Sequence, residues 1–331
     1  MLSLFRQNNI FAAAALFLFT IVIRVSPFFS PIHVDLNINA PLAQFIFNRV
    51  QNFDSYYFFS IIAASLLVFI QAWLINYITS EHGILYNDSF LPGLIFVTLN
   101  SLYPDQMLLT PQLLANTFII LLFQRLCRLY ESEKPLYIVL DSGLYLGLAS
   151  MFNYDLLVYL PFILISVIVM TSFNLRYLAV AVLGILIPIY FTAIIFFLRD
   201  NFNELLLMLE KSFNRQYVPN LKINFSQVFP WLILAPIVLF STINMQLKYF
   251  KNRVKTRRIL LDIGLMFLFS LLVVSIEDRN FIFAVTYLSA PLSIVVAYYF
   301  LSPKHLILKE IFYLLLVASA FYYQYFAPLF S

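Results

Sequence analysis

The sequence predicts an all-α, polytopic integral membrane protein with about 11 transmembrane helices. Of its 331 residues, 62% are hydrophobic and 11% are charged, and the mean hydropathy is +0.89. A soluble domain is about half apolar and a quarter charged, so this chain has too little polar surface for water. Its apolar residues also fall into runs near the roughly 20 residues that a helix needs to cross a bilayer. Secreted soluble enzymes, nucleic-acid-binding proteins and disordered proteins are therefore excluded.

Eleven apolar runs, each bounded by charge or proline, mark the predicted spans in chain order. The first run ends at Arg24 with no small-residue cleavage site after it, which indicates a retained signal anchor. Helices are favoured over strands because open-sheet backbone cannot face lipid, and the runs lack the alternation of an outer-membrane barrel. The predicted spans are residues 11–23, 56–77, 90–102, 108–123, 137–152, 156–171, 177–198, 229–245, 259–276, 281–301 and 306–326.

The distribution of Lys and Arg orients these spans. With the N-terminus inside and the C-terminus outside, 13 of the 20 Lys and Arg residues fall on the inner side. This excess agrees with the positive-inside rule, and it places the basic loop at residues 246–258 in the cytoplasm. The inner connection at residues 79–89 has no Lys or Arg. We predict one transmembrane domain over residues 1–331, in the bacterial inner membrane.

The first and fourth external loops each contain a predicted amphipathic helix, at about residues 41–54 and at residues 203–213. Apolar residues recur there at helical spacing between polar ones. In the first segment Asn39 is suited to cap the helix and Pro41 to begin it. Both helices are expected to lie on the outer membrane face.

Ionisable residues on the outer side are the candidates for chemistry, because groups on opposite faces of a membrane cannot share one site. Asp35 lies in an Asn- and Pro-rich loop between a span and an interfacial helix, where an ionisable group is often functional. Arg279 begins the tenth span, where an arginine either holds a phosphate in bidentate fashion or reaches toward lipid head groups. Further external candidates are Arg24, His33, Tyr103, Asp105 and Asp155.

Other features favour structural roles. The sequence contains no HExxH, P-loop, GxGxxG, GxSxG or CxxC motif. Cys127 is the single cysteine, so neither an intrachain disulfide nor a thiolate cluster can form. Gly143 and Gly147 form a GxxxG pair, which predicts close packing of two helices.

Two stretches resemble the membrane glycosyltransferases of the GT-C superfamily. The segment DSGLYLGLASMFNYDLLVYLPF at 141–162 is similar to their central signature, a Gly-x-x-x-Gly-Leu-Ala helix, a short external turn and a Leu-rich helix carrying Pro. The segment DRNFIFAVTYLSAPLSIVVA at 278–297 resembles their late Arg-aromatic pair before a Pro-broken helix. Over residues 5–325 the whole chain is similar to an uncharacterised bacteroidete family of polytopic inner-membrane proteins, a domain of unknown function.

The GT-C resemblance implies transfer of a sugar from a polyprenyl-phosphate donor to an acceptor at the outer face. It implies Asp35 as the catalytic base or metal-associated carboxylate, with Asp105 assisting, and Arg24 and Arg279 at the lipid phosphate. Whether a divalent metal takes part stays open, since no Asp-x-Asp pair is present and Asn153–Asp155 replace a turn that often holds lysine. Membrane lipids and envelope proteins are the expected partners, without nucleic acid.

Two other functions remain open at this stage. A non-catalytic subunit of an envelope or secretion complex would keep the same helices and signatures. A lipid or solute transporter usually shows internal duplication and ionisable groups at mid-bilayer, whereas Asp141 and Asp262 lie near predicted cytoplasmic span ends and no repeat is detectable.

Overall fold

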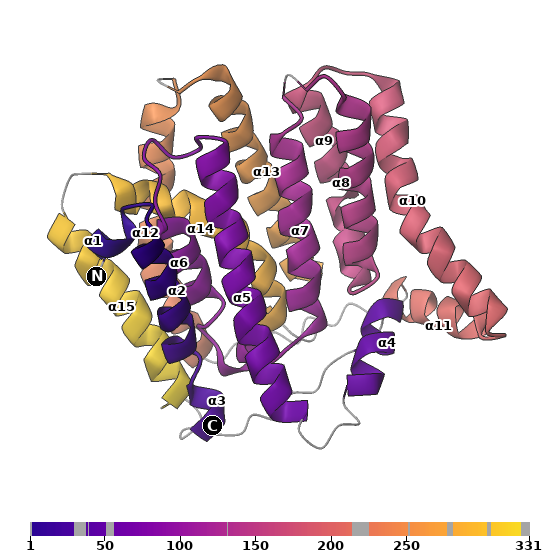
Figure 1. Cartoon of the computed structure of the whole chain (residues 1–331), viewed down its shortest axis with the longest axis horizontal. Helices are drawn as coiled ribbons and strands as arrows, with labels where there is room; N and C mark the ends of the chain where they lie inside the picture. The colour runs from indigo at the N-terminus through magenta and orange to yellow at the C-terminus, as the bar shows by residue number, and fades with distance from the viewer. Residues whose placement is uncertain are drawn as a thin grey trace.

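The computed structural model describes residues 2–29, 38, 40–50, 56–130, 132–213, 225–250, 252–276, 281–302 and 306–325, and these contain helices and connections without any strand. The all-α prediction is confirmed over this part of the chain (Figure 1). The elements are α1 (Leu2–Phe5), α2 (Ile10–Ile23), α3 (Ser26–Phe29), α4 (Pro41–Val50), α5 (Tyr56–Glu81), α6 (Leu91–Leu99), η1 (Pro104–Met107), α7 (Pro111–Cys127), α8 (Pro135–Ser150), η2 (Tyr154–Tyr159), α9 (Leu160–Met170), α10 (Leu175–Leu198), α11 (Phe202–Phe213), α12 (Phe225–Tyr249), α13 (Val254–Ile276), α14 (Phe281–Leu301) and α15 (Leu306–Tyr325).

The described helices make this a multi-pass membrane protein. Seven of them are long and apolar enough to cross a bilayer: α2 together with α3, then α5, α10, α12, α13, α14 and α15. The other four predicted spans are also helical but shorter, and α6 has only nine residues. At about 1.5 Å per residue, α6 covers about 13 Å of a hydrocarbon core about 30 Å thick. The apolar run at 90–102 is thus a short buried helix, reached by a connection that first turns back from the end of α5 (Figure 1).

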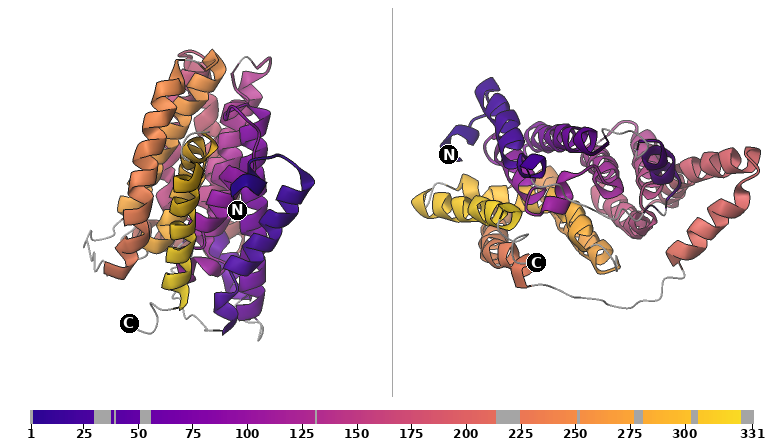
Figure 2. Two further views of the ribbon diagram at one scale, coloured as in Figure 1. Left: turned by 90° about the vertical axis from the view of Figure 1, so that its left-hand side faces the viewer. Right: turned by 90° about the horizontal axis from the view of Figure 1, so that it is seen from below.

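Helix α14 occupies the centre of the bundle. In the most apolar stretch of α14, 94% of the residues are buried inside the protein, whereas only 22% are buried in the corresponding stretches of α10 and α12. Helices α6, α12, α13 and α7 all pack against it. The outermost elements are α10 and α11, which project from one side of the bundle (Figure 2). Apolar side chains on α10 and α12 therefore face outward, where lipid is the compatible surrounding.

Helices α8 and α10 pack most closely, and glycine makes their approach possible. A methyl group at Gly143 would lie 2.3 Å from the carbonyl oxygen of Ala181, and one at Gly184 would lie 2.5 Å from that of Leu140. Gly147 meets Ile185 and Pro188 in the same way. The close packing predicted from the GxxxG pair is confirmed.

Helices α4 (Pro41–Val50) and α11 (Phe202–Phe213) overlap the two segments predicted as interfacial helices, and they contact each other. Helix α4 begins at Pro41, while its predicted cap, Asn39, lies outside the described residues. The Leu42 amide donates to the Met151 carbonyl at the end of α8. Helix α11 joins it through the Gln44 amide, which donates to the Glu204 carboxylate at 3.0 Å.

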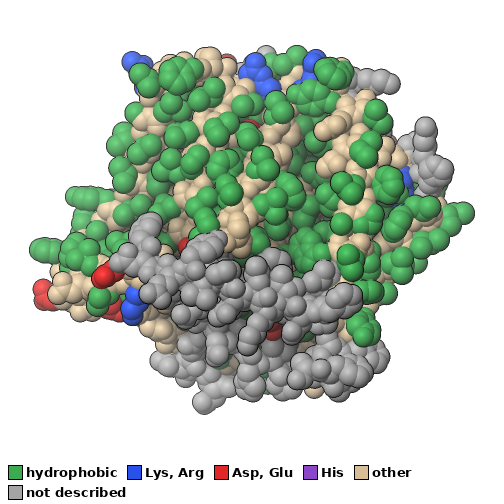
Figure 3. All heavy atoms as spheres, turned by 180° about the vertical axis from the view of Figure 1, so that it is seen from behind, with side chains coloured by type: hydrophobic (Ala, Val, Ile, Leu, Met, Phe, Trp, Pro, Cys, Tyr) green, Lys and Arg blue, Asp and Glu red, His purple; other side chains and the backbone are tan. Residues whose placement is uncertain are grey.

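Charge divides the bundle into two ends. Lys and Arg side chains gather along one end, where α7 meets α8 and α12 meets α13, and we call this the basic end (Figures 1 and 3). The connections that contain η1 and η2, together with α3, α4 and α11, lie at the other end, which we call the η end (Figure 1).

Candidate functional site

The described site candidates all lie at the η end. Arg24 follows α2, Tyr103 and Asp105 lie at η1, and Asp155 lies in η2. Asp35, His33 and Arg279 lie outside the described residues. An apolar groove of about 420 Å³ between α8 and α10 contains none of the four described candidates. The polar η end, rather than this groove, is therefore where the candidate site is built.

Arg24 is 1% exposed and holds the chain between α6 and η1 in place. Its guanidinium donates to the carbonyls of Asn100 and Gln106 at 2.9 Å and 2.8 Å. The Ser101 hydroxyl lies 3.4 Å from the same group. Because these main-chain acceptors bind both terminal nitrogens of the guanidinium, Arg24 orders the loop of Asp105, while its Nε has no hydrogen-bond partner in the described chain.

Residues on both sides of Asp105 fasten η1 to three spans. The Tyr103 hydroxyl accepts a hydrogen bond from the Trp231 indole of α12 at 2.8 Å, and its ring packs edge-on against Tyr323 of α15. The Gln106 amide donates to the carbonyl of Ile282 in the first turn of α14 at 2.8 Å. These contacts fix the loop, and burial raises the pKa of Tyr103, so its hydroxyl stays neutral.

Asp105 is the carboxyl that these contacts position. Its side chain is partly buried, and burial raises its pKa because the charged form loses solvation. Among the described residues no side chain forms an ion pair with it. A carboxyl of this kind is a stronger proton acceptor than an exposed aspartate.

Asp155 belongs to a second loop that reaches the same helix. It is 8% exposed, and its amide is capped by the Asn153 side chain at 3.1 Å. The Asn153 amide group donates to the Tyr287 hydroxyl of α14 at 3.2 Å. Thus η1 bonds to α14 at Ile282 and η2 bonds to it at Tyr287, so both loops meet the first two turns of the helix that follows Arg279.

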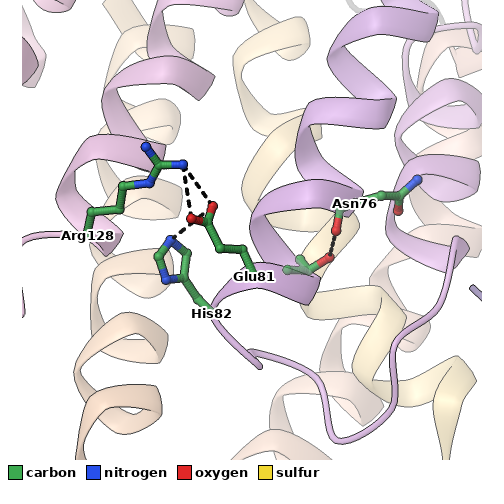
Figure 4. A network of polar contacts seen from close by, with 5 residues as sticks. Asn76, Glu81, His82 and Arg128 are labelled. Carbon is green, nitrogen blue, oxygen red and sulfur yellow. Dashed lines mark hydrogen bonds and ion pairs between the residues drawn. The ribbon is translucent and has the colours of Figure 1, made fainter.

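A second polar cluster at the basic end was not predicted as a site. The carboxylate of Glu81 at the end of α5 forms an ion pair with Arg128 after α7, at 3.0 Å (Figure 4). The His82 Nε2 lies 3.9 Å from the same carboxylate, which is too long for a hydrogen bond, and neither ring nitrogen has a hydrogen-bond partner in the described chain (Figure 4). Burial, with Lys255 and Arg128 nearby, lowers the pKa of His82 to about 4. The sequence feature that could have indicated this cluster is the connection at residues 79–89, which has no Lys or Arg of its own. Arg128, after α7, supplies the cation that pairs with Glu81.

The comparison with protein families covers most of the molecule. A family model described as a family of unknown function, DUF6427, matches residues 41–330. The chain belongs to this family. No curated protein matches the sequence.

The site of this DUF6427 protein combines candidates that lie far apart in the sequence. The matched region contains Tyr103, Asp105, Asp155 and α14, whereas Arg24 precedes it. Within the described residues no group of three His, Cys, Asp or Glu side chains is placed to hold a metal ion. What the described site offers is a partly buried carboxyl, Asp105, whose pKa is raised by burial.

Proposed function

We propose that this protein is a GT-C-like glycosyltransferase that moves a sugar from a polyprenyl-phosphate donor to an acceptor at the outer face of the inner membrane. The observation that carries the proposal is the environment of Asp105. This residue is a partly buried carboxyl with a raised pKa, held on a loop fastened to the first turn of α14. The chain's resemblance to GT-C signatures at 141–162 and 278–297 supports the reaction class.

Glycosyl transfer needs a base and a cation in defined places. As the acceptor hydroxyl oxygen bonds to the anomeric carbon, its proton passes to the base and the bond from that carbon to the phosphate oxygen breaks. In our proposal Asp105 takes this proton, with Asp35 as a second carboxylate. Arg279 then stabilises the leaving phosphate through bidentate hydrogen bonds, since Arg24 is committed to main-chain carbonyls.

The test is complementation of a deletion strain, read as lipid-linked glycans. The strain should accumulate polyprenyl-phosphate sugar and lack its glycosylated product, and the wild-type gene should reverse both. Asp105→Asn keeps the side-chain shape but cannot accept the proton, so transfer should fall about 10²- to 10⁴-fold. Asp35→Asn should act in the same direction.

Asp200→Asn is the matched control. Asp200 is an exposed aspartate between α10 and α11 with φ of 57°, a conformation that asparagine also adopts. It should complement fully, and all three variants should reach wild-type membrane levels. Full complementation by Asp105→Asn, or unchanged lipid-linked glycans in the deletion strain, would overturn the proposal. The second result would favour a non-catalytic subunit.

A further inference from the structure

A carboxyl is enclosed where three helices meet near the basic end. Asp262 on α13 is 0% exposed, and so are Ser166 on α9 and Cys127 at the end of α7. Both carboxylate oxygens of Asp262 are buried without a hydrogen-bond partner in the described chain. Charged side chains within membrane-embedded protein are rare and usually functional.

The packing of α9 against α13 places Ser166 opposite this carboxyl. Toward the basic end, the Arg258 guanidinium of α13 donates to the Met170 carbonyl of α9 at 2.9 Å. Toward the η end, the ring centroids of Phe162 on α9 and Phe269 on α13 lie 6.0 Å apart. Because the helices run antiparallel, the residues paired between these two contacts are Ser166 and Asp262.

Ser166 differs from the other serines of the described spans. Most buried serines in these helices donate to a carbonyl three residues earlier in their own helix, as Ser142, Ser150 and Ser270 do. Ser60 and Ser241 bond to another segment instead, Ser60 as acceptor from the Leu109 amide and Ser241 as donor to the Val295 carbonyl. The Ser166 hydroxyl makes no such bond, and the side chain with which it interacts is the Asp262 carboxyl. It is therefore available to the carboxyl that it faces, as donor to the ionised form or acceptor from the neutral form.

We propose that Asp262 is a proton-binding site inside the membrane domain, with Ser166 as the group that accepts or donates the hydrogen bond. An ionised carboxylate enclosed in the protein without an ion-pair partner is unfavourable, so binding a proton is the way to remove that charge. Of the elements around it, α7 contributes Cys127, and the described part of α14 carries no charged residue. The cations toward the basic end on the same helix include Arg258, which is four residues away and donates to the Met170 carbonyl, and Lys255, which is seven residues away, about 10 Å along the axis. The proton exchanges with water from that end.

Asp141 provides a matched control in the same molecule. It lies six residues into α8, as Asp262 lies eight residues into α13, and both helices begin at the basic end. Its side chain is 37% exposed and forms an ion pair with Arg125 at 3.4 Å. A neutral acid is therefore expected at Asp262, whereas Asp141 is the partly exposed, ion-paired acid with which it is compared.

The experiment is infrared spectroscopy of the full chain in lipid bilayers, titrated from about pH 5 to about pH 10 in H₂O and D₂O. We expect the C=O stretch of a protonated carboxylic acid at neutral pH. The band should shift in D₂O, disappear reversibly at high pH and be lost in Asp262→Asn but kept in Asp141→Asn. Ser166→Ala should shift its frequency, because the hydrogen bond to the carboxyl changes.

Carbodiimide labelling of the wild-type chain keeps the proposal testable if Asp262→Asn fails to fold. Carbodiimides modify protonated carboxyls, so peptide mapping should find Asp262 labelled at least about tenfold more than Asp141, with the excess lost at high pH. A C=O band unaltered by D₂O and pH would show a sealed acid and overturn the proposal. Equal labelling of the two aspartates, or labelling of Asp141 alone, would overturn it as well.

Discussion

Arg24 lies at the end of α2, where an arginine commonly extends to lipid head groups, yet its side chain is 1% exposed. Its acceptors are the carbonyls of Asn100 and Gln106, more than 75 residues away in the chain. No local pattern distinguishes a snorkelling arginine from a buried one, because the difference depends on which distant loop covers it. The sequence therefore predicted which group of connections holds the candidate residues. It could not predict the role of each ionisable group, because that role depends on hydrogen-bond partners that lie far away in the chain.

His82 gives a prediction about pH at the same scale. The imidazole has an ordinary pKa of 6.5, and burial beside Lys255 and Arg128 lowers its pKa to about 4 in the folded chain. Between these values the unfolded chain binds more protons, so stability should fall as the pH drops from about 6.5 to about 4. The measurement is the thermal unfolding midpoint in detergent across this range.

The control for this prediction is His82→Asn, which removes the titrating group. Its midpoint should depend less on pH than that of the wild type. Identical pH dependence in the two proteins would show that His82 does not contribute.

At the scale of elements, each of the eleven apolar runs predicted from the sequence contains a helix, and seven helices are long and apolar enough to cross a bilayer, but the runs did not predict the surroundings of each helix. Both α14 and α10 read as continuous apolar runs, yet α14 is surrounded by protein and α10 faces outward. Lipid and protein interiors are equally apolar, so hydrophobicity alone does not separate these two situations. The short length of α6 has the same cause, since its apolar run continues into a connection. Small residues are more specific, and Gly143 and Gly147 predicted a contact that the structure contains.

The α8–α10 contact yields a prediction with a built-in control. In Gly143→Ala the added methyl group would lie 2.3 Å from the Ala181 carbonyl oxygen, so the helices must separate. We expect a loss of about 1–3 kcal/mol in the free energy of unfolding, as for other overpacked interiors. Gly264→Ala in α13 meets no atom within 4 Å, and should be neutral or stabilising by up to about 1 kcal/mol. Detergent-solubilised variants can be ranked by thermal unfolding, and equal midpoints for the two variants would contradict this account.

At the scale of the whole molecule, charge and fold agree on two distinct ends. The sequence assigns 13 of 20 Lys and Arg residues to one side, and the folded bundle shows basic side chains gathered along one end (Figure 3). The proposed transferase site lies at the η end, with Asp105, whereas Asp262 lies toward the basic end. The proposal that transfer occurs at the outer face thus depends on the orientation of the bundle in the membrane.

Orientation can be measured with two matched cysteine variants. Glu133, between α7 and α8, is exposed at the basic end, and Glu210 on α11 is exposed at the η end. The native Cys127 is 0% exposed, so it should add little background. A membrane-impermeant maleimide applied to intact spheroplasts should label Glu210→Cys. Glu133→Cys should react only after lysis, because the positive-inside rule keeps the basic end in the cytoplasm. The reverse pattern would place Asp105 on the cytoplasmic side, and a donor handled at the outer face would then be ruled out.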